Sequence, residues 1–295
     1  MAGSVDGTFD IVVVGSANLD LVADVGDLPR PGQTVTAVSY AEHAGGKGLN
    51  QAVACARMGA RVAFVGCVGD DAAGLFLRAV LEDEGIDVTR LRVSGLPTGR
   101  AFIAVDRAGE NSIVVVPGAN ATVGVGHDID IPPCGLVLAQ LEIPLGTVAA
   151  LMSRARGMGA RTVLNPAPAA VLSDELISEC DVIAPNETEA AVLGGAGNLL
   201  ARGSGAVVLT LGARGARVMT AGSTTDIPAY PVTPVDTVGA GDAFVGAMCA
   251  ELVRGAPLED ACRVAAVAGA LATTVRGAVP GLPSLEKVLR AQAEG

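Results

Sequence analysis

Short apolar runs alternate with helix-like amphipathic stretches along most of the chain. Six runs are almost continuously apolar, which is typical of strands buried on both faces of a parallel sheet: residues 10–15, 61–67, 135–139, 160–164, 181–184 and 205–211. Helical patterns lie between or after them, at residues 47–58, 71–84, 144–157, 186–193, 240–253, 258–275 and 284–292. The alternation predicts an α/β fold with a mainly parallel central sheet flanked by helices.

Two segments interrupt this alternation. Residues 20–43 contain strand-like stretches around the turn-forming DLPRPGQTV, and residues 98–116 predict a hairpin that turns at residues 106–111. Because both stand outside the predicted main sheet, we expect them to form a small β-sheet lid over the strand ends. The chain shows no linker, repeat or low-complexity tract, so residues 1–295 are expected to form a single domain.

Composition narrows the classes of function. Half of the residues are hydrophobic but only 2% are aromatic, so the core is expected to consist of small aliphatic side chains. A net charge of −11 argues against a broad nucleic-acid-binding surface. The six cysteines form no C-x-x-C pair, as expected for free thiols in a reducing compartment. No stretch resembles a signal peptide or a membrane span, so we expect a soluble, cytoplasmic protein that binds no membrane.

The stretch VDTVGAGDAF, residues 235–244, places two aspartates around a turn of small residues at the start of a predicted helix. The first N–H groups of a helix are unpaired and carry the positive end of its dipole, so a phosphate can approach them closely. Asp242 in the first turn can accept a proton from an alcohol that attacks such a phosphate. The same pattern also fits a glycine-containing loop followed by an ordinary acidic helix start.

Other polar pairs follow the predicted strands. Asn18 and Asp20 in GSANLD suit sugar hydroxyls, and Lys47 and Asn50 in GGKGLN are three apart at a helix start. Asn186 and Glu189 in PNETEA are also three apart, and a carboxylate there could hold a hydrated Mg²⁺. The glycines of TLGARG could let a nucleotide lie against the backbone. Each of these motifs, taken alone, also fits a polar loop or a helix cap.

Taken in order, these stretches resemble the ribokinase-like (PfkB) family of sugar kinases over nearly the whole chain. The matching segments are GSANLD, GGKGLNQAVA, GDD, PGAN, QLEIPL, LNPAPA, PNETEA, TLGARG and DTVGAGDAF. The resemblance implies ATP-dependent phosphorylation of D-ribose at O5. Within the same family, 2-deoxyribose, fructose, a keto-deoxy sugar acid or a nucleoside are alternative substrates. A non-catalytic sugar- or nucleotide-sensing module and a structural or scaffold protein are alternatives of other classes.

The resemblance also implies residue roles. Asp242 is the expected base, and the amides of Gly239, Ala240 and Gly241 are the expected anion hole. The expected sugar-binding residues are Asn18, Asp20, Gly46, Lys47, Asn50, Glu142 and Asp242. The expected ATP-binding residues are Asn186, Thr210, Gly212, Gly215 and Gly241. Glu189 is expected to organise Mg²⁺ indirectly. A K⁺ ion is expected at Asp236 and the carbonyl groups of Val238, Thr273, Arg276 and Ala278. The lid is expected to pair two subunits in a homodimer.

The chain departs from the family pattern in two places. Residues 194–205 form a shorter connection than is usual, which predicts a truncated helix on the ATP side. Ala266 stands where a polar side chain commonly approaches the adenine, so the nucleotide preference is expected to differ.

Overall fold

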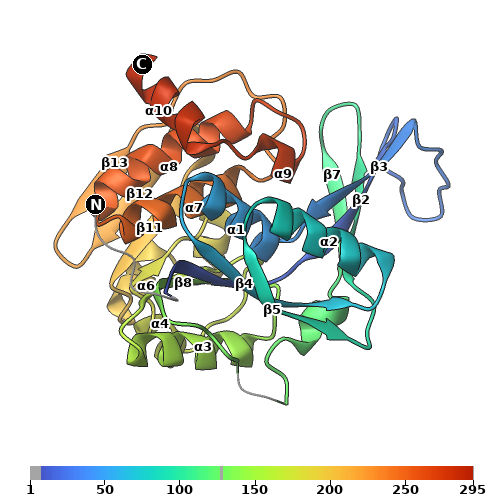
Figure 1. Ribbon diagram of the computed structural model, residues 1–295. Helices are drawn as coiled ribbons and strands as arrows, with labels where there is room; N and C mark the ends of the chain where they lie inside the picture. Colours follow the sequence, from blue (N-terminus) through green and yellow to red (C-terminus); the bar gives the residue numbers. More distant parts are fainter. Residues whose placement is uncertain (1–7, 127–128, 295) are drawn as a thin grey trace.

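The computed structural model describes residues 8–126 and 129–294. In this part of the chain nine strands form one sheet in the order β13-β12-β11-β10-β9-β8-β1-β4-β5 (Figure 1). Their bounds are β1 Phe9–Val14, β4 Val62–Gly69, β5 Asp87–Ser94, β8 Cys134–Gln140, β9 Arg161–Asn165, β10 Val182–Ile183, β11 Ala206–Thr210, β12 Ala216–Thr220 and β13 Thr224–Ile227. The seven strands from β5 to β11 in this order are parallel to one another. Strand β12 pairs antiparallel with β11, and β13 pairs antiparallel with β12. The predicted α/β fold with a mainly parallel sheet is therefore confirmed.

Helices cover both faces of this sheet (Figure 1). Their bounds are α1 Lys47–Arg57, α2 Ala72–Asp83, α3 Leu145–Gly157, α4 Asp174–Ser178, α5 Glu187–Val192, α6 Ala196–Ala201, α7 Ala240–Val253, α8 Leu258–Ala272, α9 Ala278–Gly281 and α10 Leu285–Glu294, with 3₁₀ turns at Gly118–Thr122 and Gly212–Arg214. Strand β1 shows why its apolar run is continuous. Ile11 and Val13 pack with α1 and α7 on one face, whereas Val12 and Val14 pack with α3 on the other.

The segments that interrupt the alternation form a separate four-stranded sheet in the order β3-β2-β6-β7 (Figure 1). Its strands are β2 Asn18–Asp24, β3 Ser39–Gly45, β6 Gly99–Val105 and β7 Asn111–Val116. Strands β6 and β7 pair as the predicted hairpin, and the connection between them spans residues 106–110. We call these four strands the small sheet.

Several elements differ from the sequence prediction. Strands β5, β12 and β13 and helices α4 and α6 were not predicted, β10 has only two residues, and the predicted helix 258–275 ends at Ala272. Strand β5 lies at the edge of the sheet and carries the charged Arg90 and Arg92, so its sequence lacks the continuous apolar run of an inner strand. Helix α6, with six residues, occupies the connection predicted to be short.

Within residues 8–126 and 129–294, no helix combines the length and the apolar character needed to cross a membrane. All six cysteines are free thiols.

Candidate functional site

The predicted site residues gather where the small sheet meets the carboxyl edge of the main sheet. Asn18 and Asp20 lie on β2, Lys47 and Asn50 on α1, and Glu142 in the connection after β8. Asp242 reaches the same place from the first turn of α7. Carboxyl ends of parallel strands are where α/β proteins bind ligands, so the fold brings these side chains together at the expected edge.

The turn before α7 needs its glycine for two reasons. Gly239 is the N-cap residue and adopts a left-handed conformation with φ of 80°. A Cβ at this position would also lie 2.9 Å from the Cα of Ala278. The amide of Ala240 donates to the carbonyl of Thr237 at 3.3 Å. The first amides of α7 are therefore held in place beside Asp242, at the positive end of the helix dipole.

The Asp242 carboxylate is buried and both of its oxygens accept hydrogen bonds from consecutive residues of α1. Asn50 Nδ2 donates to Oδ2 at 3.0 Å, and Gln51 Nε2 donates to Oδ1 at 2.9 Å. Helices α1 and α7 pack closely enough for these bonds because α7 carries Gly246 where the helices meet. A Cβ there would lie 2.4 Å from the Cβ of Ala54.

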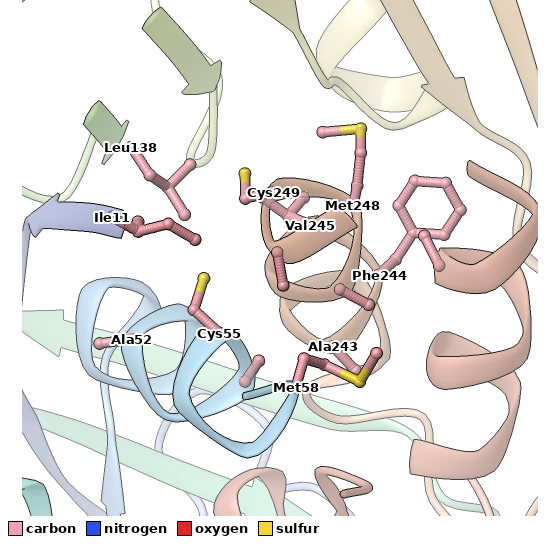
Figure 2. Close-up of a cluster of buried hydrophobic side chains, with 14 of the residues drawn as sticks. Ile11, Ala52, Cys55, Met58, Leu138, Ala243, Phe244, Val245, Met248 and Cys249 are labelled. Carbon is pink, nitrogen blue, oxygen red and sulfur yellow. The ribbon is translucent and has the colours of Figure 1, made fainter. Parts of the chain in front are cut away.

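Figure 2 shows apolar side chains between the two helices. Cys55 of α1, Met58 directly after α1, and Val245 and Cys249 of α7 lie in this cluster with Ile11 of β1. The packing of α1 on α7 thus sets the distance between the Asn50 amide and the Asp242 carboxylate.

Glu142 joins three segments of the site. Its Oε2 accepts hydrogen bonds from Ser16 Oγ at 2.5 Å, from the Lys47 amide at 3.1 Å and from Asn18 Nδ2 at 3.5 Å. Asn18 Oδ1 in turn accepts from Asn120 Nδ2 at 2.7 Å. The first residues of β2 are therefore tied to α1 and to the connection after β8.

Asp20 is a partly buried carboxylate that accepts no hydrogen bond from the residues the structure describes. It lies over Gly45, where a Cβ would come within 2.0 Å of its Oδ2. Burial, together with the neighbouring charges of Glu142 and Asp242, raises the pKa of Asp20 from 3.8 to about 7. A group in this position can bind a polar ligand that donates hydrogen bonds.

Lys47 is the positive charge among these carboxylates. Burial lowers its pKa, but the charges of Asp242, Glu142 and Glu189 outweigh that effect, so the net pKa is raised and the ammonium group stays charged. The preceding Gly46 adopts a φ of 87°, and a Cβ there would lie 2.8 Å from the Asn18 amide. Asn50 Oδ1 is buried and has no hydrogen-bond partner within residues 8–126 and 129–294.

Asn186 and Glu189 form a capping box at the start of α5. Glu189 Oε2 accepts from the Asn186 amide and Oε1 from Asn186 Nδ2, both at 2.9 Å, and the Glu189 amide donates to Asn186 Oδ1 at 2.8 Å. Burial raises the pKa of Glu189. Thr210 lies beside Asn186 through a parallel bridge.

Two glycines follow Thr210 with positive φ angles, Gly212 at 57° and Gly215 at 89°. A Cβ on Gly215 would lie 2.1 Å from the carbonyl oxygen of Ile227. Four of the five predicted ATP-binding residues, Asn186, Thr210, Gly212 and Gly215, therefore lie at the adjacent ends of β10 and β11, and the fifth, Gly241, lies in the first turn of α7. Ala266 lies buried on α8.

Asp236 lies against the segment around residues 273–278, which the family resemblance groups with it at the expected K⁺ site. Its Oδ1 accepts from the amide of Val238 at 3.0 Å and its Oδ2 from the amide of Gly277 at 2.8 Å. The carbonyl of Thr273 accepts from the amides of Val235 and Asp236 at 2.7 and 3.0 Å. Arg276 and Ala278 flank Gly277. Among the residues that the structure describes, no three His, Cys, Asp or Glu side chains gather closely enough to hold a metal ion.

Several polar residues of this site were not predicted from the sequence. Ser16 and Asn120 bind Glu142 and Asn18, and Gln51, Gln140 and Asn165 form a buried chain behind Asp242. Each is a polar residue within or directly after an apolar run. That is the only signal in the sequence, because their partners are far away along the chain.

The chain is similar to known proteins over nearly its whole length. Residues 8–285 match the pfkB family carbohydrate kinase pattern. The ribokinase of Haemophilus influenzae is 39% identical over 95% of this chain and 97% of its own. A deoxyribokinase of Salmonella typhimurium is 34% identical over 94% and 97%. Among solved structures, Arabidopsis thaliana ribokinase complexed with ribose and ATP superposes with a TM-score of 0.86. It is 30% identical over 96% of this chain and 98% of its own.

Proposed function

This chain belongs to the pfkB family of carbohydrate kinases, and from that premise we propose that it transfers the γ-phosphoryl group of ATP to O5 of D-ribose, giving ribose 5-phosphate and ADP. The observation that carries the proposal is the buried carboxylate of Asp242 in the first turn of α7, which the side-chain amides of Asn50 and Gln51 of α1 hold in place. A base and a helix N-terminus side by side are what the attack of an alcohol on a phosphate requires.

Asp242 accepts the proton of the C5 hydroxyl as that oxygen attacks the phosphorus. The amides of Gly239, Ala240 and Gly241 stabilise the negative charge on the transferring group from the start of α7, and the Ala240 amide does so in place of its 3.3 Å hydrogen bond to the Thr237 carbonyl. Lys47 adds a positive charge to the same region. Phosphoryl transfer depends mainly on positioning and charge stabilisation, and these groups supply both.

The sugar is bound by groups that lack a protein partner or can take a second one. Asp20 has no donor among the described residues, and the buried Asn50 Oδ1 has no partner, so both can accept hydrogen bonds from sugar hydroxyls. Asn18 and Glu142 lie beside them, and Gly46 lets α1 begin close to β2. An unpartnered buried acceptor is costly in the free protein, which favours a hydroxyl-rich ligand here.

ATP lies along the ends of β10 and β11 in this proposal. Asn186, Thr210, Gly212 and Gly215 line its site, and Gly241 meets the phosphates. A Mg²⁺ ion neutralises phosphate charge in such reactions, and Glu189 would hold it through water, because its two oxygens already cap α5. Because Ala266 stands where a polar side chain commonly approaches the adenine, and because α6 has only six residues, the nucleotide preference of this protein should differ from the family's usual one.

A K⁺ ion would be held by Asp236 and nearby carbonyl groups. Val238 itself supplies one of the two amides that bind the Asp236 carboxylate, and Arg276 and Ala278 flank Gly277, which supplies the other. The Thr273 carbonyl already accepts two amide hydrogen bonds, so it is the weakest member of the expected set. An ion there would stiffen the turn that begins α7.

We further propose that residues 1–295 form one domain in which the small sheet is a lid that pairs two copies of the chain. All six residues of the edge strand β7 are exposed, among them Ile113, Val114, Val115 and Val116. An exposed apolar edge strand favours burial against another copy. The free thiols support the cytoplasm as its compartment.

A kinase of another substrate is the second candidate, because a deoxyribokinase is 34% identical to this chain. The product of the reaction decides between them. Incubation of D-ribose with ATP and Mg²⁺ should give ribose 5-phosphate, identified by ³¹P NMR. The analogue 5-deoxyribose should inhibit competitively without being phosphorylated, since it lacks the attacking hydroxyl. Phosphorylation of 5-deoxyribose, or no ribose 5-phosphate, would contradict the proposal.

A further inference from the structure

We propose that Gln51 is a positioning residue for the base Asp242, and that Gln140 and Asn165 hold Gln51 in the orientation this role needs. The inference rests on the proposed phosphoryl transfer. It concerns three side chains that lie behind the base and to which the resemblance assigned no role.

The geometry forms a continuous chain of amide hydrogen bonds. Gln51 Nε2 donates to Asp242 Oδ1 and to Asn165 Oδ1, both at 2.9 Å. Gln51 Oε1 accepts from Gln140 Nε2 at 2.6 Å, and Asn165 Nδ2 donates to the Ala184 carbonyl at 2.8 Å. Gln51 and Gln140 are fully buried and Asn165 is 8% exposed. These hydrogen bonds therefore run from α7 through α1 to the ends of β8, β9 and β10 through buried side chains.

The two ends of this chain fix the orientation of every amide in it. The Ala184 carbonyl can only accept, so Asn165 must turn its Nδ2 toward it and its Oδ1 toward Gln51. Gln51 must then present Nε2 to Asn165, and the same group has a second proton for the carboxylate of Asp242. Its Oε1 is left for Gln140. A flipped Gln51 would place an oxygen against two acceptors, so the backbone of Ala184 sets which atom faces the base.

The consequence for the base is a fixed carboxylate. Asn50 and Gln51 hold its two oxygens from two consecutive residues of α1, so the side chain cannot rotate away from the helix start. General bases act only when their oxygen lies within hydrogen-bond reach of the proton they remove. Asn50 also faces the sugar in the proposed function, whereas Gln51 contacts only protein groups. Its effect therefore passes through Asp242.

A contribution to stability alone does not explain these hydrogen-bonded amides. Gln140 Oε1 is buried and has no hydrogen-bond partner in the part of the protein that the structure describes, and a Cβ on the neighbouring Gly15 would lie 2.2 Å from it. A buried unpaired acceptor lowers stability, and apolar side chains of the same shape would avoid that cost.

The test compares Gln51→Met, which keeps the length of the side chain and removes its amide, with Thr162→Val. Thr162 is a buried hydrogen-bonding residue at the opposite end of β9, so it is a matched control for the loss of buried hydrogen bonds. We expect Gln51→Met to lower kcat about tenfold to a hundredfold, a part of what general base catalysis contributes. The KM values for ribose and ATP should stay within about twofold, because neither ligand contacts Gln51. Thr162→Val should keep the wild-type kcat.

A double variant separates positioning from a general loss of structure. In the Asp242→Asn background, Gln51→Met should cause no further fall in kcat, since residues that act as one unit are not additive. Gln140→Met should lower kcat less than Gln51→Met and serves as the second variant if the latter folds poorly.

A kcat of Gln51→Met within about twofold of wild type, a raised KM with unchanged kcat, or a full additional loss in the double variant would overturn the inference. In those cases an active wild type leaves the proposed function standing. A wild type with no turnover on any sugar would overturn both.

Discussion

Replacing Asp20 by Asn should make the sugar-free protein more stable at neutral pH. The Asp20 carboxylate is partly buried, has no donor among the described residues and has its pKa raised from 3.8 to about 7. The folded state therefore binds a proton between these two values that the unfolded state has lost. The free energy of unfolding falls as the pH rises through this window and levels off above about 7. The difference between the two pKa values corresponds to at most about 4 kcal/mol.

Asp20→Asn removes this dependence because the amide does not titrate. Relative to wild type, the variant's free energy of unfolding should rise between pH 4 and pH 8 by up to about 4 kcal/mol. Urea denaturation without sugar, at steps of pH, measures the difference. The same variant should bind ribose about tenfold to a hundredfold more weakly, because it loses a charged acceptor.

Asp226→Asn is the control of opposite sign. The hydrogen bond from Arg217 lowers the pKa of Asp226, so this carboxylate stabilises the folded state above its unfolded pKa and that contribution is lost as the pH falls through its folded value. Asp226→Asn should therefore lower the free energy of unfolding, relative to wild type, more at pH 8 than at pH 3. If Asp20→Asn showed a stability difference that did not change with pH, or were less stable than wild type at pH 8, the assignment of Asp20 as an unpaired ligand-binding carboxylate would be refuted.

Three further predictions concern the base, the cation and the helix contact. Asp242→Asn should lower kcat about 10²- to 10⁴-fold and keep ribose binding by calorimetry; near-normal turnover would exclude Asp242 as the base. Asp236→Ala should weaken the activation by KCl, and an unchanged KCl titration would count against the cation site. Gly246→Ala should lower the free energy of unfolding by about 1–3 kcal/mol, because a Cβ there would lie 2.4 Å from the Cβ of Ala54. The same variant should lower kcat. Wild-type values in thermal unfolding and kinetics would show that the helices adjust to the added methyl group without cost.

The inner strands of the sheet were predictable because both of their faces are buried. In β1 four successive apolar residues are fully buried, on alternating faces, so burial leaves a continuous signal in the sequence. Strand β5 at the edge carries a half-buried Arg90 and an exposed Arg92, and its sequence is compatible with a loop. Edge strands depend on the neighbour they pair with, which a local pattern does not contain.

The residues of the candidate site also differ in whether a local sequence pattern predicts them. Lys47, Asn50 and Asp242 were predicted because glycine-rich helix starts and close polar spacing are local features. Gln51 was not, because it follows Asn50 on a helix face that otherwise looks like core. Its partner Asp242 is 191 positions away. Only the close packing of α1 on α7 reveals that this buried amide faces the carboxylate of Asp242.

The most direct test of the account is ADP release from ATP and Mg²⁺ with a panel of acceptors, each measured with and without K⁺. The panel contains D-ribose, 2-deoxyribose, fructose, a keto-deoxy sugar acid and a nucleoside. The account predicts that D-ribose has the highest kcat/KM and that K⁺ raises it. Turnover that is highest on another acceptor would contradict ribose as the substrate, and no turnover on any acceptor would contradict the assignment of Asp242 and the start of α7 as a catalytic site.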